Sequence, residues 1–335
     1  MTRNGPSTMR LARPRRVKRG VRGDAVVFVV FSQAAYILVD DYTAANFFSE
    51  FDFFSSDDPT HGYVNYLDRT AAKSQGLAFT ANNAIYMGVD FKNVASGRGR
   101  SSVRLTSNKA YDSGLIIVDI EHMPGGICGT WPAFWMFGPN WPNNGEIDII
   151  EGVHEQTSNL MAMHTKPGCR ITNSGDFAGD ILTPDCDVHA PGQPANAGCS
   201  VQSKDTASYG AWFNANGGGV YATEISETAV TIWFFPRNTV PGDIETGTPN
   251  PKAWPKPMAK FHGACDIAAN IKQQKIVFDT TFCGDWAGSV WSTSSCAAKA
   301  ATCQEFVQHN PTAFKEAYWN VNYVRYFSNK VPGVY

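Results

Sequence analysis

The chain has 335 residues, of which 43% are hydrophobic and 17% are charged, with a formal net charge of −2. A chain with so few charges and no basic excess is a poor partner for polyanions, so we expect no nucleic acid ligand. Nine tryptophans in such a chain indicate either a large core or a surface that stacks on sugar rings. Composition alone does not separate these two interpretations.

The first 34 residues have the order of regions found in a secretory signal peptide. Residues 10–22 are strongly basic, residues 25–31 are apolar, and Ser32-Gln33-Ala34 offers small residues for cleavage. This order predicts a leader over 1–34 and a secreted, extracellular protein. No other stretch is as long and apolar as a membrane span requires, so we expect no stable membrane insertion.

Short apolar runs follow the leader and are separated by turn residues. Residues 84–89, 103–106 and 115–120 are rich in β-branched or apolar side chains and are bounded by Gly, Asn, Asp and Ser. Such runs predict strands, and the unbroken apolar run 115–118 is typical of a strand covered on both faces. Many short strands predict an all-β, two-sheet sandwich, and we expect a single domain over 35–335.

The segment Asn144 to Gly152 reads NGEIDIIEG and contains three acids among three isoleucines. On a regular strand Glu146 and Asp148 share a face, whereas Glu151, five positions from Glu146, would point into the core at a cost of several kcal/mol. The consecutive apolar pair Ile149-Ile150 breaks the alternation where one extra residue is needed. A β-bulge there would return Glu151 to the face of the other two acids.

Three neighbouring carboxyls raise each other's pKa, and this separation of protonation states is what glycoside hydrolysis requires. Close spacing on one strand favours the retaining form of the reaction. We therefore assign Glu146 as nucleophile, Glu151 as acid/base, and Asp148 as a hydrogen-bonding partner that orients Glu146. The segment also fits a solvated acidic strand edge or a calcium site, although calcium sites are more often Asn-, Asp- and Gly-rich loops.

The second half of the chain continues the β pattern with two long polar interruptions. Residues 221–225 and 230–235 predict a hairpin, and residues 276–282 predict a further strand. In the run 319–327, the odd-numbered residues are expected to share one face. Residues 297–307 predict a helix. The polar stretches 165–208 and 236–257 are longer than most loops, which indicates a function or covalent stapling.

The chain contains eight cysteines, with no CxxC pair and no histidine at zinc spacing. An even number without metal-site spacing predicts disulfides formed in an oxidising compartment, although reduced, buried cysteines are the alternative. Eight cysteines allow 105 pairings, so the connectivity is not predictable. They are Cys128, Cys169, Cys186, Cys199, Cys265, Cys283, Cys296 and Cys303.

Several motifs resemble those of fungal laminarinase-like enzymes of glycoside hydrolase family sixteen, in the order of that family. They are residues 58–62 (DPTHG), 64–66 (VNY), 129–135 (GTWPAFW), Trp141-Pro142, 144–152, 163–165 (MHT) and 282–288 (FCGDWAG). The resemblance covers the chain from about Tyr36 to near its end. It implies a β-jelly roll whose concave sheet holds the substrate, and retaining hydrolysis of β-1,3 or mixed β-1,3/1,4 glucan.

The resemblance also assigns the three acids the roles given above and suggests further site residues. Tryptophan rings offer flat faces to sugars, and the candidate sugar-binding residues are Trp131, Trp135, Trp141 and Trp286. For Trp135, a position in the core is an equally good interpretation. His164 is expected near the acids, although a lone histidine is more often structural. Asn144, and Asn143 beside it, either bind sugar hydroxyls or form the turn.

Two other functions share these residues. A cell-wall glucan transglycosylase forms the same glycosyl intermediate but passes it to another sugar, and a non-catalytic sugar-binding module needs only the fold. We expect an endo-acting hydrolase that is a monomer, binds a β-glucan polysaccharide and needs no cofactor or catalytic metal. The sequence leaves open a structural calcium ion on the outer sheet.

Overall fold

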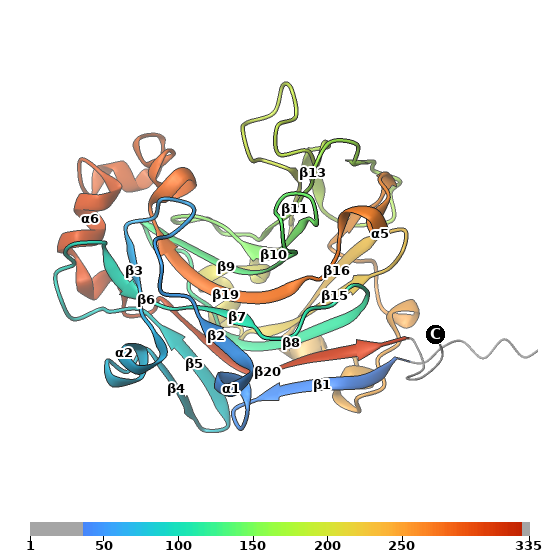
Figure 1. The fold of residues 1–335 in the computed structure, drawn as a ribbon, viewed down its shortest axis with the longest axis horizontal. Helices are drawn as coiled ribbons and strands as arrows, with labels where there is room; N and C mark the ends of the chain where they lie inside the picture. Colours follow the sequence, from blue (N-terminus) through green and yellow to red (C-terminus); the bar gives the residue numbers. More distant parts are fainter. Residues whose placement is uncertain (1–35, 330–335) are drawn as a thin grey trace, which may run out of the picture. The chain divides into compact units, whose positions relative to one another are not determined.

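The computed structural model describes residues 36–329, and the predicted leader 1–34 lies outside this range. The described part is built mainly from two eight-stranded antiparallel sheets (Figure 1). Sheet A has the order β17-β16-β15-β8-β20-β5-β4, with β1 also paired to β20. Sheet B has the order β13-β14-β11-β10-β9-β19-β7-β2. The predicted all-β two-sheet sandwich is therefore confirmed.

The strands of sheet A are β1 (Ile37–Thr43), β4 (Ala78–Ala81), β5 (Ala84–Gly88), β8 (Gly114–His122), β15 (Gly219–Ile225), β16 (Val230–Pro236), β17 (Ala259–Phe261) and β20 (Tyr318–Ser328). Those of sheet B are β2 (Phe51–Phe53), β7 (Arg104–Ser107), β9 (Thr130–Phe137), β10 (Glu146–Glu151), β11 (Leu160–His164), β13 (Asp180–Thr183), β14 (Cys199–Gln202) and β19 (Lys275–Phe282). Two small pairs are β3 (Val64–Tyr66) with β6 (Arg100–Ser102), and β12 (Arg170–Ile171) with β18 (Gly263–Ala264).

The helices are short and lie in the connections between strands. They are α1 (Phe47–Glu50), α2 (Arg69–Ser74), α3 (Gly210–Ala215), α4 (Gly242–Glu245), α5 (Ile267–Asn270) and α6 (Cys303–His309). Single helical turns are η1 (Thr206–Ser208), η2 (Arg237–Thr239), η3 (Pro251–Ala253), η4 (Gly284–Gly288), η5 (Trp291–Thr293), η6 (Ser295–Ala298) and η7 (Pro311–Phe314). No helix in residues 36–329 combines the length and apolarity needed to cross a membrane.

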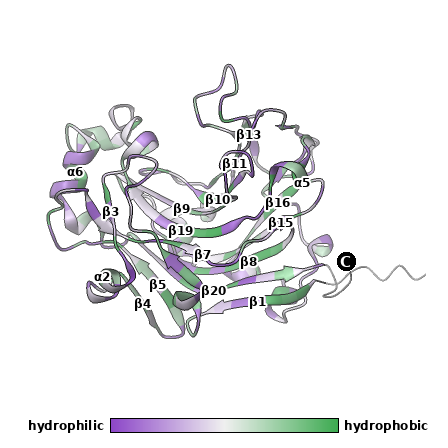
Figure 2. Ribbon diagram, viewed as in Figure 1, coloured by the Kyte–Doolittle hydropathy of each residue, from purple (hydrophilic) through white to green (hydrophobic). Residues whose placement is uncertain are grey.

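The main core lies between the two sheets, and hydrophobic residues are concentrated in their strands (Figure 2). Strand β8 supplies Ile116 and Val118 to this core, while Leu115 and Ile117 join a second cluster on the opposite face of sheet A. This second cluster is completed by Trp254 from the polar stretch 236–257. The prediction that β8 is covered on both faces is therefore confirmed, and the long stretch after β16 is part of its cover.

Strand β20 differs from the sequence expectation because it contains an extra residue. Val321 lies opposite Ile120, and Tyr323 lies opposite Asp119, so Asn322 is unpaired between them. Beyond this bulge the faces exchange: Val324 packs in the main core, while Tyr323 and Phe327 pack with the outer cluster. The expectation that the odd-numbered residues of 319–327 share one face was therefore wrong.

The helix expected over 297–307 is also revised. A single turn, η6, ends at Ala298, and α6 starts only at Cys303, where the Thr302 hydroxyl oxygen accepts a hydrogen bond from the Glu305 N–H. Cys296 and Cys303 form disulfides with different strand-end partners, Cys128 and Cys283. Two separate covalent attachments seven residues apart hold the intervening segment as a loop.

All eight cysteines are paired, so the disulfide prediction is confirmed. The other two disulfides are Cys169–Cys265 and Cys186–Cys199, and both tie down the polar stretch 165–208. That stretch also contributes β12, β13 and β14 to the sheets. Its length is therefore accommodated by covalent stapling and by strand pairing.

Candidate active site

The acids of β10 share one face of sheet B because the strand is bulged. Asp148 lies opposite Trp135 of β9 and Ile150 opposite Phe134, so Ile149 is an extra residue. Glu146 and Glu151 then lie opposite Phe137 and Ala133. Residues directly opposite each other in an antiparallel pair project to the same side. Since 133, 135 and 137 are alternate residues of β9, the three acids project to one side, as predicted.

The isoleucines of β10 fill the opposite face. Ile147, Ile149 and Ile150 are all fully buried in the main core. The bulge therefore places two consecutive isoleucines in the core and keeps Glu151 out of it. This arrangement confirms the prediction made from the pair Ile149-Ile150.

His164 of β11 lies beside the first two acids. Its Nε2 is 3.0 Å from Oδ2 of Asp148 and 3.8 Å from Oε1 of Glu146. The contact with Asp148 lies at ion-pair distance but without hydrogen-bond geometry, and Asp148 is almost completely buried. No hydrogen bond joins Asp148 to Glu146 among residues 36–329, so the expected direct bond between them is replaced by the shared neighbour His164.

Glu151 is held at its carboxylate end by an indole. The Nε1–H of Trp131 donates a 2.7 Å hydrogen bond to Oε1 of Glu151. Trp286, in the turn η4, packs edge-to-face on Trp131 with ring centroids 5.6 Å apart. Both rings are half-buried. The structure thus brings two of the four candidate tryptophans, Trp131 and Trp286, together beside Glu151, and their contacts with sugar stay a prediction.

Burial and mutual repulsion both favour protonation of the acids. Burial is the largest cause of a raised pKa for Glu146, Asp148 and Glu151, and the charge of Asp148 raises the pKa of the other two further. His164 and Arg104 lower the pKa of Glu146, and the Trp131 hydrogen bond lowers that of Glu151. A trio with this coupling retains protons at pH values where isolated carboxyls have lost them.

Trp135 lies on the face of the acids, not in the core cluster. Its Nε1–H donates a 3.1 Å hydrogen bond to Oδ1 of Asp279, and the guanidinium of Arg104 lies 4.9 Å from its ring centroid. Asp279 also accepts a 2.9 Å hydrogen bond from the Tyr66 hydroxyl. Burial raises the pKa of Asp279 to about 6, and its charge in turn raises that of Asp148.

Asp279 and Arg104 were not predicted as site residues. Both lie in strands that the sequence did predict, and cross-strand pairing places Arg104, Asp279 and Ala133 side by side. A charged residue in the middle of an apolar strand was the available signal, because burying it without partners is costly. Only the strand order shows that these two residues adjoin the acids.

Trp141 and Asn144 lie in the connection between β9 and β10. Trp141 is one of the most exposed large hydrophobic residues of the described chain, at 42%. The main-chain carbonyl of Asn144 accepts hydrogen bonds from the Lys272 N–H and from Nε2 of Gln274. Asn144 thus takes part in fixing this turn, and sugar contacts by Trp141, Asn144 or its neighbour Asn143 stay predictions.

A hollow of about 600 Å³ lies beside a cross-strand neighbour of the acid cluster, and none of the three acids lines it. Its lining includes Phe137 of β9, Lys275 of β19, and Thr106 of β7. Phe137 is the direct cross-strand neighbour of Glu146 and also lies opposite Lys275. The hollow therefore extends across sheet B from the Glu146 end of the acid cluster toward β7.

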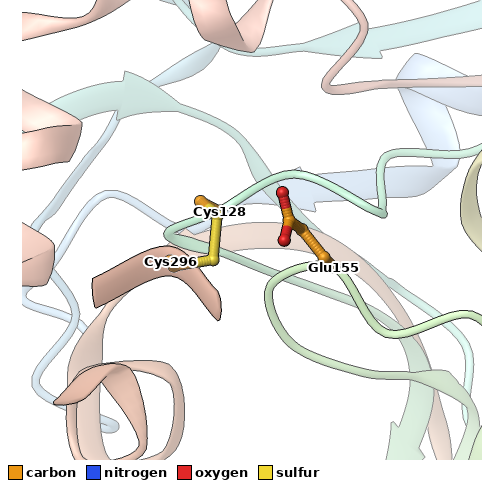
Figure 3. A group of neighbouring side chains, drawn as sticks. All are labelled: Cys128, Glu155 and Cys296. Atoms are coloured by element: carbon orange, nitrogen blue, oxygen red, sulfur yellow. A yellow bond between two sulfur atoms is a disulfide. The ribbon is translucent and has the colours of Figure 1, made fainter. Parts of the chain in front are cut away.

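Two groups in the described chain bring possible metal ligands within 4.8 Å of one another. One is Glu146, Asp148 and His164, which is the acid cluster itself. The other is Glu155 beside Cys128 and Cys296, whose sulfurs are joined to each other as Figure 3 shows. A disulfide offers no thiolate to a metal, so this second group is a structural contact.

Comparison with known proteins gives a consistent family. The model of the XgeA-like catalytic GH16 domain matches residues 51–327. An endo-1,3(4)-beta-glucanase of Arthroderma benhamiae is 52% identical over 88% of this chain and 65% of its own length. The endo-1,3(4)-beta-glucanase xgeA of Emericella nidulans is 42% identical over 90% of this chain and 49% of its own length. The chain thus spans about half to two thirds of these relatives.

Solved structures that resemble this chain belong to the same family. An elongating GH family 16 beta-1,3-glucosyltransferase superimposes with a TM-score of 0.83 at 46% identity, covering 88% of this chain and 100% of that chain. Laminarinase 16A from Phanerochaete chrysosporium was solved with two beta-glucans in donor and acceptor sites. It superimposes with a TM-score of 0.82 at 40% identity, covering 88% of this chain and 100% of that chain. With its bulged acid strand and jelly-roll fold, this chain belongs to glycoside hydrolase family 16, as an XgeA-like catalytic domain.

Proposed function

We propose that this chain is a retaining endo-1,3(4)-β-glucanase that uses Glu146 as nucleophile and Glu151 as acid/base. The observation that carries the proposal is the bulge at Ile149, which puts three carboxyls on one face beside two indoles. Retaining glycosidases need two carboxyls close together with different protonation states. The names of the glucanase relatives support the substrate class.

In the first step, a carboxylate oxygen of Glu146 attacks the anomeric carbon and the bond to the glycosidic oxygen breaks. The proton of Glu151 goes to that oxygen, so the leaving sugar departs as an alcohol. In the second step, a water attacks the anomeric carbon, gives its proton to Glu151 and releases Glu146. Each residue ends as it began, and the configuration is inverted twice.

The neighbouring groups support these roles. Burial and the charge of Asp148 raise the pKa of Glu146 to about 8, and His164 and Arg104 oppose that rise, which favours the charged form that a nucleophile needs. Burial and the charge of Asp148 raise the pKa of Glu151, which favours the proton that an acid must donate. The indole rings of Trp131 and Trp286 supply apolar faces for glucose rings next to Glu151.

The location and the assembly are also proposals. Four disulfides support secretion, because disulfides persist in oxidising compartments. We also propose that the chain acts as a monomer. We propose no cofactor, since each step above is balanced by carboxyls and water.

The test is product analysis on laminarin, lichenan and xyloglucan with the wild type and the Glu146→Ser variant. We expect internal cleavage of the first two glucans, no cleavage of xyloglucan, and loss of activity in the variant. Proton NMR of the first products should show the β-anomer before mutarotation. Cleavage with inversion, or an active Glu146→Ser variant, would refute the proposed roles, and rapid xyloglucan cleavage would refute the substrate class.

Glucosyl transfer is a second candidate, favoured by the structural likeness to a glucosyltransferase at 46% identity. In a transferase, the hydroxyl of another glucan replaces water in the second step. Mass spectrometry of products from laminariheptaose distinguishes the two functions. A hydrolase yields only shorter chains at low substrate concentration, whereas a transferase yields chains longer than seven glucoses and little new reducing end.

A further inference from the structure

The bulge that positions Glu151 leaves two main-chain groups in need of partners. In a regular ladder each N–H and C=O is satisfied by the next strand, but an extra residue interrupts that pattern. Between β10 and β11, the pairing passes directly from Asp148 opposite Ala162 to Glu151 opposite Leu160. The carbonyl of Ile149 and the N–H of Glu151 lie within this interrupted stretch.

One side chain satisfies both groups. Oδ1 of Asn159 accepts a 2.9 Å hydrogen bond from the Glu151 N–H, and its Nδ2 donates a 2.7 Å hydrogen bond to the Ile149 carbonyl. The amide therefore replaces the missing strand partners on either side of Ile150. A side-chain amide carries an acceptor and a donor on one planar end, so it can make both bonds at once.

Asn159 is itself held firmly. It is completely buried, and its N–H donates to Oγ of Ser208 at 3.0 Å. Its carbonyl accepts hydrogen bonds from the Ser203 N–H at 2.9 Å and from Nε2 of Gln202 at 3.0 Å. The position of the Asn159 amide is thus fixed by a buried network, which in turn fixes the bulged main chain.

We infer that Asn159 is a positioning residue for the acid/base, an inference that rests on the proposed function. Glu151 is held at two points: its N–H by Asn159 and its carboxylate by Trp131. The first hold sets the direction in which the side chain leaves the strand. Without it, the extra residue can shift along β10, and Glu151 loses its place beside the leaving oxygen while Glu146, which precedes the bulge, keeps its own.

This role has a consequence that a merely structural role lacks. Misplacing the acid slows departure of a poor leaving group, such as the sugar hydroxyl of laminarin, because that oxygen needs a proton. It hardly affects dinitrophenolate, which leaves without one. The value of kcat/KM reports the steps up to bond cleavage, so comparing laminarin with a 2,4-dinitrophenyl β-laminaribioside isolates the contribution of the acid.

The experiment measures kcat/KM on both substrates for the wild type and for Asn159→Ala. General acid catalysis contributes about 10²–10⁴-fold, so we expect a fall of at least about tenfold on laminarin and less than about twofold on the dinitrophenyl substrate. Because Glu151 also accepts the proton of the attacking water in the second step, kcat on the dinitrophenyl substrate should fall even though kcat/KM does not. Sodium azide should restore this kcat, since azide needs no base. Equal losses on the two substrates would overturn the inference.

The matched control is Asn214→Ala. Asn214 clamps main chain in the same way, with Oδ1 accepting from the Met123 N–H at 2.9 Å and Nδ2 donating to the Met123 carbonyl at 3.0 Å. It touches neither the bulge nor an acid through these bonds. We expect this variant to lose thermal stability but to affect both substrates equally, and selective loss on laminarin would overturn the inference.

Ser208→Ala is the variant to use if Asn159→Ala does not fold. It removes the hydroxyl that accepts from the Asn159 N–H and donates to the Asp205 carbonyl, and we expect a smaller loss with the same preference for laminarin. A folded Ser208→Ala variant with equal losses would count against the inference. Failure of the proposed function can be distinguished from failure of this inference, because in the former case the wild type itself would be inactive on both substrates.

Discussion

The Trp131→Phe substitution tests how Glu151 is tuned. It removes the indole N–H that donates to Oε1 of Glu151 at 2.7 Å but keeps an aromatic ring. This hydrogen bond stabilises the carboxylate and so lowers the pKa of Glu151, and losing it must raise that pKa. Because an acid must be protonated to act, kcat/KM falls as the pH rises through its pKa. The basic limb of the profile should therefore move to higher pH.

The size of the shift follows from the bond that is lost. A hydrogen bond to a charged group is worth about 1.5–3 kcal/mol, and one pKa unit corresponds to about 1.36 kcal/mol. Trp131 is half-buried, so water replaces part of the lost bond. We expect an upward shift of about one unit, below the limit of about two units set by the full bond.

The assay is the pH dependence of kcat/KM on laminarin, measured by reducing-sugar release well below KM. Trp286→Phe is the matched control, because it alters the same aromatic pair and leaves the bond to Glu151 intact. It should weaken sugar binding at every pH without moving the basic limb. A Trp131→Phe profile with an unmoved or lowered basic limb would refute the assigned tuning.

Three further outcomes are expected. Asp148→Asn removes a negative charge that raises the pKa of Glu151, so the basic limb should move to lower pH, opposite to Trp131→Phe. Arg100→Met should destabilise the fold by about 3–5 kcal/mol in urea unfolding, since the fully buried guanidinium donates to several main-chain carbonyls that would lose their partner. Replacing Cys128 and Cys296 with alanine should cost up to about 5 kcal/mol, because their disulfide closes a loop with a sequence separation of 168.

Each of these outcomes has a clear contrary result. An upward shift of the basic limb in Asp148→Asn would contradict the repulsion assigned to that acid. A wild-type urea midpoint in Arg100→Met would show that solvent replaces the buried donors. Removal of Cys186–Cys199, which closes a loop of separation 13, should cost only about 3 kcal/mol, so an equal loss for both disulfides would contradict the loop-entropy account.

The sequence predicted local structure well where the chemistry of the side chains allowed only one arrangement of the strand. In β10, carboxyls cannot occupy the positions of buried isoleucines, so the pair Ile149-Ile150 required a bulge, and the bulge is present. In β20, the bulge at Asn322 was missed. Tyrosine and arginine side chains can lie on either the buried or the exposed face of a sheet. Regular alternation along β20 therefore placed no residue on an unfavourable face, and nothing in the sequence indicated an extra residue.

Tertiary structure alone decided which distant residues complete the site. Asp279, Arg104 and Asn159 adjoin the acids through strand order and a buried network, and no spacing within the sequence encodes these neighbours. The disulfide connectivity was likewise one of many pairings until the fold set the distances. Local patterns determine which face a side chain takes, because that depends on its immediate neighbours along the strand. The partners across the sheet depend on the long-range order of strands, which only the packed chain defines.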